Sequence, residues 1–288
     1  MKELKILAVV VFFTAVLYYL VEPFAHSQMH PHVAPADFAF SDLEKNNKTG
    51  DAAKGAETFM AAGCIGCHGL KSQGMPSPMD EATASASFGV VPPDLSTAGY
   101  LYDATFLAAL IKEPTVALKV EHKFNETKLH PMTKFYGVGG DIDQEIADIV
   151  AYLKSIAPAT LTNKEVFVDA CLRCHSIKYD QQFSPSEPEA LQKYMGTTPP
   201  DLSMMIRSKG ETYLETFINN PQKQLKGTSM PRVGLTKATQ QQVVDYMEKV
   251  GDRKKAERQD LGVKILGFFM LLSALAILWK IKMWREVH

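Results

Sequence analysis

The sequence predicts an all-α fold, in which two similar helical domains lie in tandem between an N-terminal and a C-terminal transmembrane helix. Three observations predict it. A Cys-x-x-Cys-His motif occurs at residues 64–68 and again at 171–175. The features around the second copy repeat those around the first at a constant spacing. Long apolar runs lie near both ends, and the segments between carry apolar residues at helical spacing.

The two motifs contain every cysteine of the chain: Cys64, Cys67, Cys171 and Cys174. Two thiols at this spacing can reach the two vinyl groups of one porphyrin, and the histidine that follows then lies beneath the iron. A redox dithiol or half a zinc site would also use a Cys-x-x-Cys pair, but neither explains a histidine after both copies. The motifs therefore predict two covalently bound haem c groups, with His68 and His175 as iron ligands.

The repeat extends well beyond the motifs. Cys171 follows Cys64 by 107 residues, and the same offset relates the Pro-Pro-Asp-Leu-Ser segments at 92–96 and 199–203. Pro114 and Pro221, which we expect to end matched helices, keep this offset as well. Self-similarity at a fixed spacing indicates an internal duplication.

The offset changes in the last part of each repeat. Met230 follows Met132 by only 98 residues, and the segment at 121–124 has no counterpart in the second repeat. We therefore expect an insertion in a loop of the first domain, where insertions are tolerated. Apolar residues at helical spacing predict that an amphipathic helix follows each methionine, at 142–156 and 237–250.

Length and composition fit two ordinary folded domains. The chain has 288 residues, 46% of them hydrophobic, and a net charge of -1, so nothing suggests a nucleic acid partner. Residues 37–157 hold 10 basic and 16 acidic side chains, whereas residues 158–250 hold 11 and 10. The acidic first domain suggests docking of a basic soluble cytochrome, although a charged face is more often merely solvated.

The N-terminal run, residues 4–21, is interrupted only by Lys5. Eighteen residues at 1.5 Å each give about 27 Å, just enough for a bilayer core of about 30 Å. A cleaved signal peptide would present small residues near its end, but Pro23 stands there instead. We therefore expect a retained anchor over residues 1–22, followed by a polar approach segment over residues 23–50.

The C-terminal run covers residues 261–284, about 36 Å of helix, and suits a tilted transmembrane span. Lys264 lies near its start, where a long side chain can reach the headgroups, and Trp279 and Trp284 suit the far interface. With the two haem domains predicted at 51–157 and 158–250, a juxtamembrane segment and this helix occupy 251–288.

Each repeat matches the pattern of the class I cytochrome c family in full, and the chain resembles that family on these motifs. The resemblance implies that an axial methionine lies on a loop before the last helix. Met132 in His-Pro-Met and Met230 in Ser-Met-Pro hold that position. His130 is the rival ligand in the first domain, and the weaker rivals in the second are Met195, Met204 and Met205.

The resemblance also implies contacts within each domain. The first and last helices should cross at an aromatic pair, Phe59 with Tyr152 and Phe167 with Tyr246. A proline carbonyl should accept a hydrogen bond from each axial histidine, and the matching residues are Pro93 and Pro200. That bond orients the ring and makes the ligand more electron-rich.

Protein ligands on both sides of each iron would leave no open position for a small substrate. Electron transfer is the consequence, and we identify no catalytic residue in the chain. Two similarly ligated haems can exchange electrons in either direction, because a one-electron step changes its equilibrium constant tenfold for about 59 mV.

The C-terminal end narrows the resemblance to a membrane complex. A c-type domain followed by residues 257–264, an apolar helix and residues 280–284 resembles the end of cytochrome c1. That subunit usually has one haem and a cleaved signal, so the chain is more similar to the di-haem subunit that replaces it in some bacterial bc1 complexes (complex III). This implies cytochrome b and a Rieske protein as partners, and a soluble cytochrome c or terminal oxidase as acceptor.

The implied location is the bacterial inner membrane, with the haem domains in the periplasm and both termini in the cytoplasm. Covalent haem attachment in bacteria takes place outside the cytoplasmic membrane, whereas basic residues on both sides of the second apolar run leave the positive-inside rule undecided. Three alternatives stay open: the di-haem subunit of a cbb3-type oxidase, a di-haem peroxidase and a free-standing membrane electron carrier.

Overall fold

The structure is a computed structural model, and it describes residues 2–29 and 35–287. These residues form helices and loops, with no β-strand among them, as the sequence predicts. The first domain contains α3 (Ala52–Ala61), the short helices η2 (Cys64–Gly66) and η3 (Lys71–Gln73), α4 (Glu81–Phe88), α5 (Ala98–Leu101), α6 (Ala104–Lys112), α7 (Pro114–Ala117) and α8 (Ile142–Ser155).

The second domain repeats this order. It contains α9 (Asn163–Phe167), the π-helical η4 (Val168–Leu172), η5 (Lys178–Asp180), α10 (Pro188–Met195), α11 (Met205–Lys209), α12 (Glu211–Asn219), α13 (Pro221–Gln224) and α14 (Lys237–Gly251). Helices α10 and α12 have the bounds of α4 and α6 displaced by 107 residues. The duplication predicted from the motifs is thus confirmed in the structure, while the predicted domain limits stay a prediction.

The first and last helices of each domain cross as the family resemblance implies. The rings of Phe59 and Tyr152 lie 5.7 Å apart, and those of Phe167 and Tyr246 lie 4.9 Å apart. At the first crossing, a Cβ atom on Gly55 would lie 1.9 Å from the carbonyl oxygen of Asp148. Only a residue without a side chain therefore allows α3 and α8 to approach this closely.

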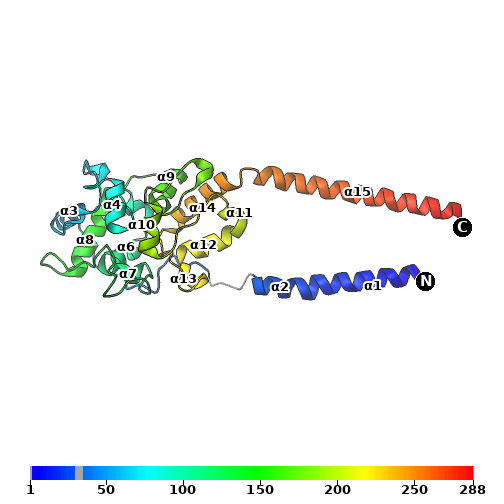
Figure 1. The fold of residues 1–288 in the computed structure, drawn as a ribbon, viewed down its shortest axis with the longest axis horizontal. Helices are drawn as coiled ribbons and strands as arrows, with labels where there is room; N and C mark the ends of the chain where they lie inside the picture. The colour runs from blue at the N-terminus through cyan, green and yellow to red at the C-terminus, as the bar shows by residue number, and fades with distance from the viewer. Residues whose placement is uncertain (1, 30–34, 288) are drawn as a thin grey trace.

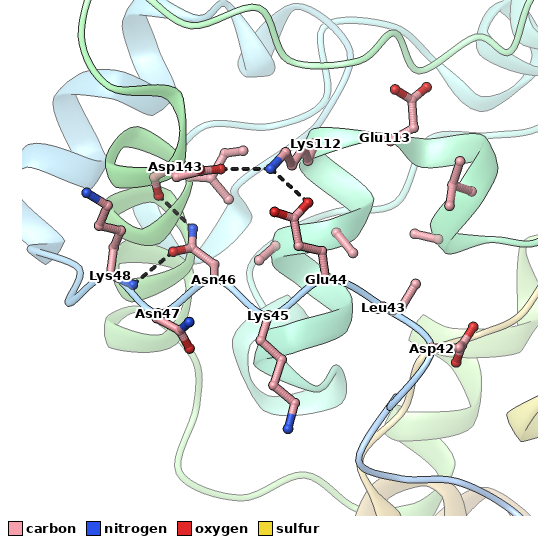
Figure 2. A pocket seen from close by; sticks show the side chains of 15 residues that line it. Asp42, Leu43, Glu44, Lys45, Asn46, Asn47, Lys48, Lys112, Glu113 and Asp143 are labelled. Atoms are coloured by element: carbon pink, nitrogen blue, oxygen red, sulfur yellow. Dashed lines mark hydrogen bonds and ion pairs between the residues drawn. The ribbon is translucent and has the colours of Figure 1, made fainter.

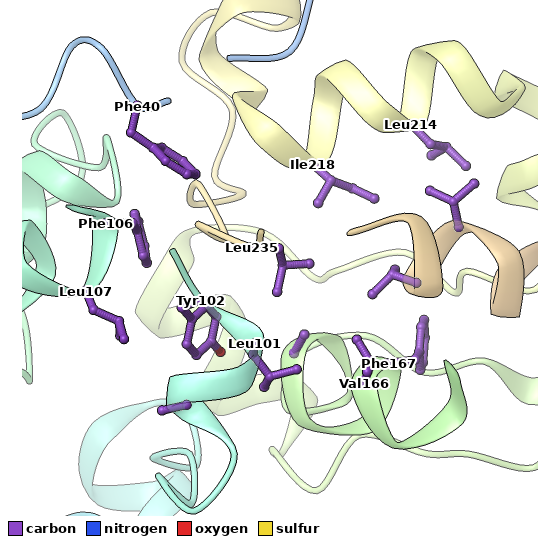
Figure 3. Close-up of a cluster of buried hydrophobic side chains, with 14 of the residues drawn as sticks. Phe40, Leu101, Tyr102, Phe106, Leu107, Val166, Phe167, Leu214, Ile218 and Leu235 are labelled. Carbon is purple, nitrogen blue, oxygen red and sulfur yellow. The ribbon is translucent and has the colours of Figure 1, made fainter. Parts of the chain in front are cut away.

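One cluster of buried hydrophobic side chains spans both domains. Figure 3 shows Phe106 and Tyr102 of the first domain beside Leu235 of the second domain, and farther along the cluster Val166 and Phe167 of α9. All five side chains are buried. Because the core is continuous across the repeat boundary, the two domains form one packed unit.

The approach segment belongs to this unit. Phe40 is 1% exposed and packs on Phe106, with ring centroids 5.8 Å apart. The backbone amide of Asp37 donates to Asn219 Oδ1 at 2.9 Å. Residues 35–50 therefore fasten to both domains, while residues 30–34 of the predicted approach segment lie outside the described residues.

Two apolar helical segments extend in the same direction from the packed unit, beyond the second domain (Figure 1). The N-terminal one comprises α1 (Lys2–Val16), the π-helical η1 (Leu17–Val21) and α2 (Glu22–Met29), and the C-terminal one is α15 (Lys255–Val287). Each is long and apolar enough to cross a membrane, and no part of either apolar window is buried in the protein. The helix at the N-terminus continues past the predicted limit at residue 22. The amide of Glu22 donates to Leu17, so a π-turn lies directly before Pro23.

Candidate functional site

Both Cys-x-x-Cys-His motifs fold into the same turn. The amides of Cys67 and His68 donate to the carbonyl of Cys64 at 3.3 and 3.0 Å. In the second motif, the amides of Cys174 and His175 donate to the carbonyl of Cys171 at 3.2 and 3.0 Å. The four cysteines are free thiols. Each turn therefore presents two thiols and a histidine from one short stretch of backbone.

Each motif histidine lies against the proline that the resemblance implies. Nδ1 of His68 lies 2.9 Å from the carbonyl oxygen of Pro93, and Nδ1 of His175 lies 2.9 Å from that of Pro200. Burial lowers the pKa of both imidazoles, so the neutral form dominates and its Nδ1–H is the donor. Among the described residues neither Nε2 atom has a hydrogen-bond partner, so it is free to bind a metal.

An aspartate and a serine hold each proline segment against its motif. Asp94 Oδ2 accepts from the amide of Lys71 at 3.1 Å, and Ser96 Oγ accepts from that of Ser72 at 3.0 Å. Asp201 and Ser203 make the equivalent bonds to the amides of Lys178 and Tyr179, both at 3.1 Å. Sequence reasoning found these residues as part of the repeat but assigned them no role. Their recurrence after both Pro-Pro pairs in the sequence is the signal that could have indicated this role.

Burial keeps motif thiols protonated. It raises the pKa of Cys64 and of Cys174, and it raises the pKa of Cys171 to about 12. A dithiol redox centre needs an activated thiolate, so protonated thiols in apolar surroundings do not suit that function.

The loop that carries Met132 is held through His130. Nδ1 of His130 lies 2.9 Å from the carbonyl oxygen of Met132, and Nε2 lies 3.1 Å from the hydroxyl of Tyr194. Both ring nitrogens of this rival ligand are thus occupied. Binding to iron would cost His130 one of these bonds, which favours the half-buried Met132 as the ligand.

In the second domain, half-buried Met230 packs against the same hydrophobic cluster as Cys171. Of its rivals, Met205 packs against this cluster too, whereas Met195 and Met204 do not belong to it. Met195 is buried in a cluster with Val120 and Phe124, Met204 is exposed, and the sulfur of Met205 lies 3.8 Å from Ser208 Oγ. The assignment of Met132 and Met230 to iron nevertheless stays a prediction.

The loop that carries Met230 lies across the first domain. The amide of Arg232 donates to the carbonyl of Leu118 at 2.9 Å, and the amide of Asp103 donates to the carbonyl of Gly234 at 3.0 Å. The side chain of Phe106 leaves no room for a Cβ atom on Gly234. Each domain therefore supports the methionine loop of the other.

A surface cavity of about 380 Å³ lies apart from these residues, between residues 42–48 and the helices α6, α7 and α8. Figure 2 shows Lys112 at its rim, bonded to Glu44 at 3.1 Å and to Asp143 at 3.0 Å. None of the predicted haem residues lines it. Its ion pairs hold the approach segment against the first domain.

The residues present fit a c-type haem in each domain. In each motif two free thiols precede a neutral histidine whose Nδ1 is fixed and whose Nε2 is unbonded among the described residues. Apolar side chains pack around both motifs. This donor set can anchor a porphyrin by two thioethers and bind its iron from one side.

Comparison with known proteins agrees with this geometry. The family model described as Cytochrome c matches residues 52–157 and 163–251, one match for each repeat. None of the curated proteins compared with the chain is significantly similar to it. A chain of a solved structure entitled "Hyperthermophilic respiratory Complex III" shares 24% sequence identity, with 44% of this chain and 75% of that chain covered. Its TM-score of 0.34 is too low to support an argument about fold or function.

The two family matches cover more than half of the sequence. The chain therefore belongs to the cytochrome c family, with two domains of that family in tandem.

Proposed function

We propose that this chain is a membrane-anchored di-haem c-type cytochrome that relays single electrons. The observation that carries the proposal is the repeated geometry in which His68 and His175 each hold Nδ1 on a proline carbonyl beside two free thiols. Family membership implies covalently bound haem c and electron transfer. Haem c, when bound, supplies reversible one-electron oxidation and reduction of its iron.

The chain would attach the haems and complete both iron sites itself. Cys64, Cys67, Cys171 and Cys174 would form the thioethers, and His68 with Met132 and His175 with Met230 would be the axial ligands. The carbonyls of Pro93 and Pro200 would keep each imidazole oriented and electron-rich. Thioether sulfur is a neutral, soft ligand that raises the potential relative to a second histidine.

We propose further that the chain is the cytochrome c1-like subunit of a bacterial complex III, quinol:cytochrome c reductase. Support comes from the long apolar helix α15 that follows the second haem domain directly, as at the end of cytochrome c1. The subunit would take electrons from a Rieske protein that works with cytochrome b, and pass them to a soluble cytochrome c or a terminal oxidase. The two terminal helices would anchor it in the inner membrane, with the packed unit in the periplasm.

The proposal is tested by extracting the full chain from its native membrane with a mild detergent and identifying the chains that co-purify. We expect a cytochrome b and a Rieske protein, together with antimycin-sensitive quinol:cytochrome c reductase activity. A copper-haem oxidase would contradict complex III and support the oxidase alternative, and absence of stable partners would support a free-standing carrier. A high-spin optical spectrum with turnover of hydrogen peroxide would contradict electron relay and indicate a peroxidase.

A further inference from the structure

The insertion of the first domain lies against the second domain. Residues 119–130 contain this insertion, because the stretch between α7 and Met132 is nine residues longer than the stretch between α13 and Met230. Lys128 Nζ donates to the carbonyl oxygens of Lys193 and Tyr194 at 3.2 and 2.7 Å, at the C-terminal end of α10. A lysine suits this position, because the end of a helix presents unpaired carbonyls and a partial negative charge.

Apolar contacts also join the insertion to α10. Val120 and Phe124 of the insertion form a buried cluster with Met195 of α10. The ring of Phe124 lies 4.8 Å from that of His130, in an edge-to-face arrangement, and 5.4 Å from that of Tyr194. His130 is therefore held from both sides, by its own loop and by the second domain.

The hydrogen bonds of His130 have a defined direction. The carbonyl of Met132 can only accept, so Nδ1 of His130 carries the proton, and Nε2 of the neutral imidazole has the lone pair that accepts from a hydroxyl. Tyr194 then donates to Nε2, and Nδ1–H donates to the carbonyl of Met132. A short path of two hydrogen bonds thus runs from α10 to the backbone of Met132.

We propose that Tyr194 and His130 are positioning residues for Met132, so that the second domain holds the loop with the axial methionine of the first. The inference rests on the proposed function, in which Met132 binds iron. The inference also gives the insertion a role. Its residues bring the loop that carries Met132 into contact with α10 of the second domain.

The test compares Tyr194→Phe with Tyr100→Phe in the full chain carrying both haems. Tyr100 is a matched control, because its hydroxyl also crosses between the domains, to Gln242 Oε1 at 3.2 Å, but contacts no methionine loop. The readouts are the upfield-shifted axial methionine methyl signals in the proton NMR spectrum of the reduced protein, and the affinity of the oxidised protein for imidazole.

We expect Tyr194→Phe to shift or broaden one methyl signal, that of Met132, and to leave that of Met230 in place. Loss of one hydrogen bond should raise the affinity for imidazole roughly fivefold at one haem. Tyr100→Phe should change neither readout. His130→Asn, which retains an N–H near the Met132 carbonyl but is too short to reach Tyr194, should reproduce the effect of Tyr194→Phe and serves if that variant does not fold.

Unchanged spectra and imidazole affinity in both variants would overturn the proposal, as would an equal effect of Tyr100→Phe, which would indicate general loosening of the interface. A further variant, Met132→Ala, distinguishes failure of this proposal from failure of the proposed function. If Met132 binds iron, this variant loses one methyl signal. If both signals remain, the ligand assignment itself is wrong.

Discussion

Buried Arg232 of the second domain forms an ion pair with partly exposed Asp42 of the approach segment. Nη2 of Arg232 lies 2.9 Å from both carboxylate oxygens of Asp42, and the guanidinium lies 5.6 Å from the ring centre of Phe40. The arginine side chain is only 2% exposed. This contact joins the approach segment to the loop that carries Met230, and we expect the stability of the whole unit to depend on it.

Arg232→Ala should therefore destabilise the protein by about 2–4 kcal/mol, because it leaves a void beside Phe40 where the buried guanidinium lay and removes one partner of Asp42. Chemical denaturation of the detergent-solubilised chain, followed by circular dichroism, measures the change. The control is Lys254→Ala, which removes an exposed ion pair with Glu257 and should cost less than about 0.5 kcal/mol. Equal effects of the two substitutions would contradict a structural role for Arg232.

The same pair predicts how acid affects stability. Burial alone would raise the pKa of Asp42, but hydrogen bonds and charge interactions with Lys119 and Arg232 lower it overall. A carboxylate whose pKa is lowered by folding stabilises the protein above its ordinary pKa of about 3.9, and this contribution is lost as the pH falls through the lowered value.

We therefore expect a constant difference in melting temperature between the native chain and Asp42→Asn from pH 7 to about pH 5, and a decreasing difference below about pH 4. Melting curves of both proteins across this range provide the measurement. A difference that grows as the pH falls would show that the charge of Asp42 opposes folding.

Gly55→Ala tests the close crossing of α3 and α8. The added Cβ atom would overlap the carbonyl of Asp148, so the helices would have to separate, and we expect a loss of stability of about 2 kcal/mol or more. Gly262→Ala is the matched control, because no atom lies within 4 Å of its Cβ position. Thermal unfolding of both variants gives the comparison. No loss in Gly55→Ala would mean that α3 and α8 do not cross in close contact at this glycine.

Much of each domain could be predicted from the sequence, because the information is local or repeated. The motif turns, the helices around them and the bonds of His68 to Pro93 and of His175 to Pro200 recur at one offset. The aromatic crossings also follow from the family pattern. In these cases one copy supports the interpretation of the other.

The contacts between domains could not be predicted in this way. Phe40 lies in a polar segment, and neither periodicity nor the repeat indicates that it packs on α6. The loop at residues 119–130 contains nine residues more than its counterpart in the second domain, so the repeat gives no indication of the contact of Lys128 with Tyr194. Pro23 argued against a cleaved signal peptide, but nothing in the sequence indicated that the helix continues to Met29 with a π-turn directly before this proline.

The central claim is that one chain binds two haem groups covalently, one through each motif. The most direct measurement is the ratio of haem to protein in the purified full-length chain, from the pyridine haemochrome spectrum and the intact mass. We expect two haem c groups per chain, and one in a variant with Cys171→Ala and Cys174→Ala. A native chain with a single covalent haem, or with none, would contradict the account.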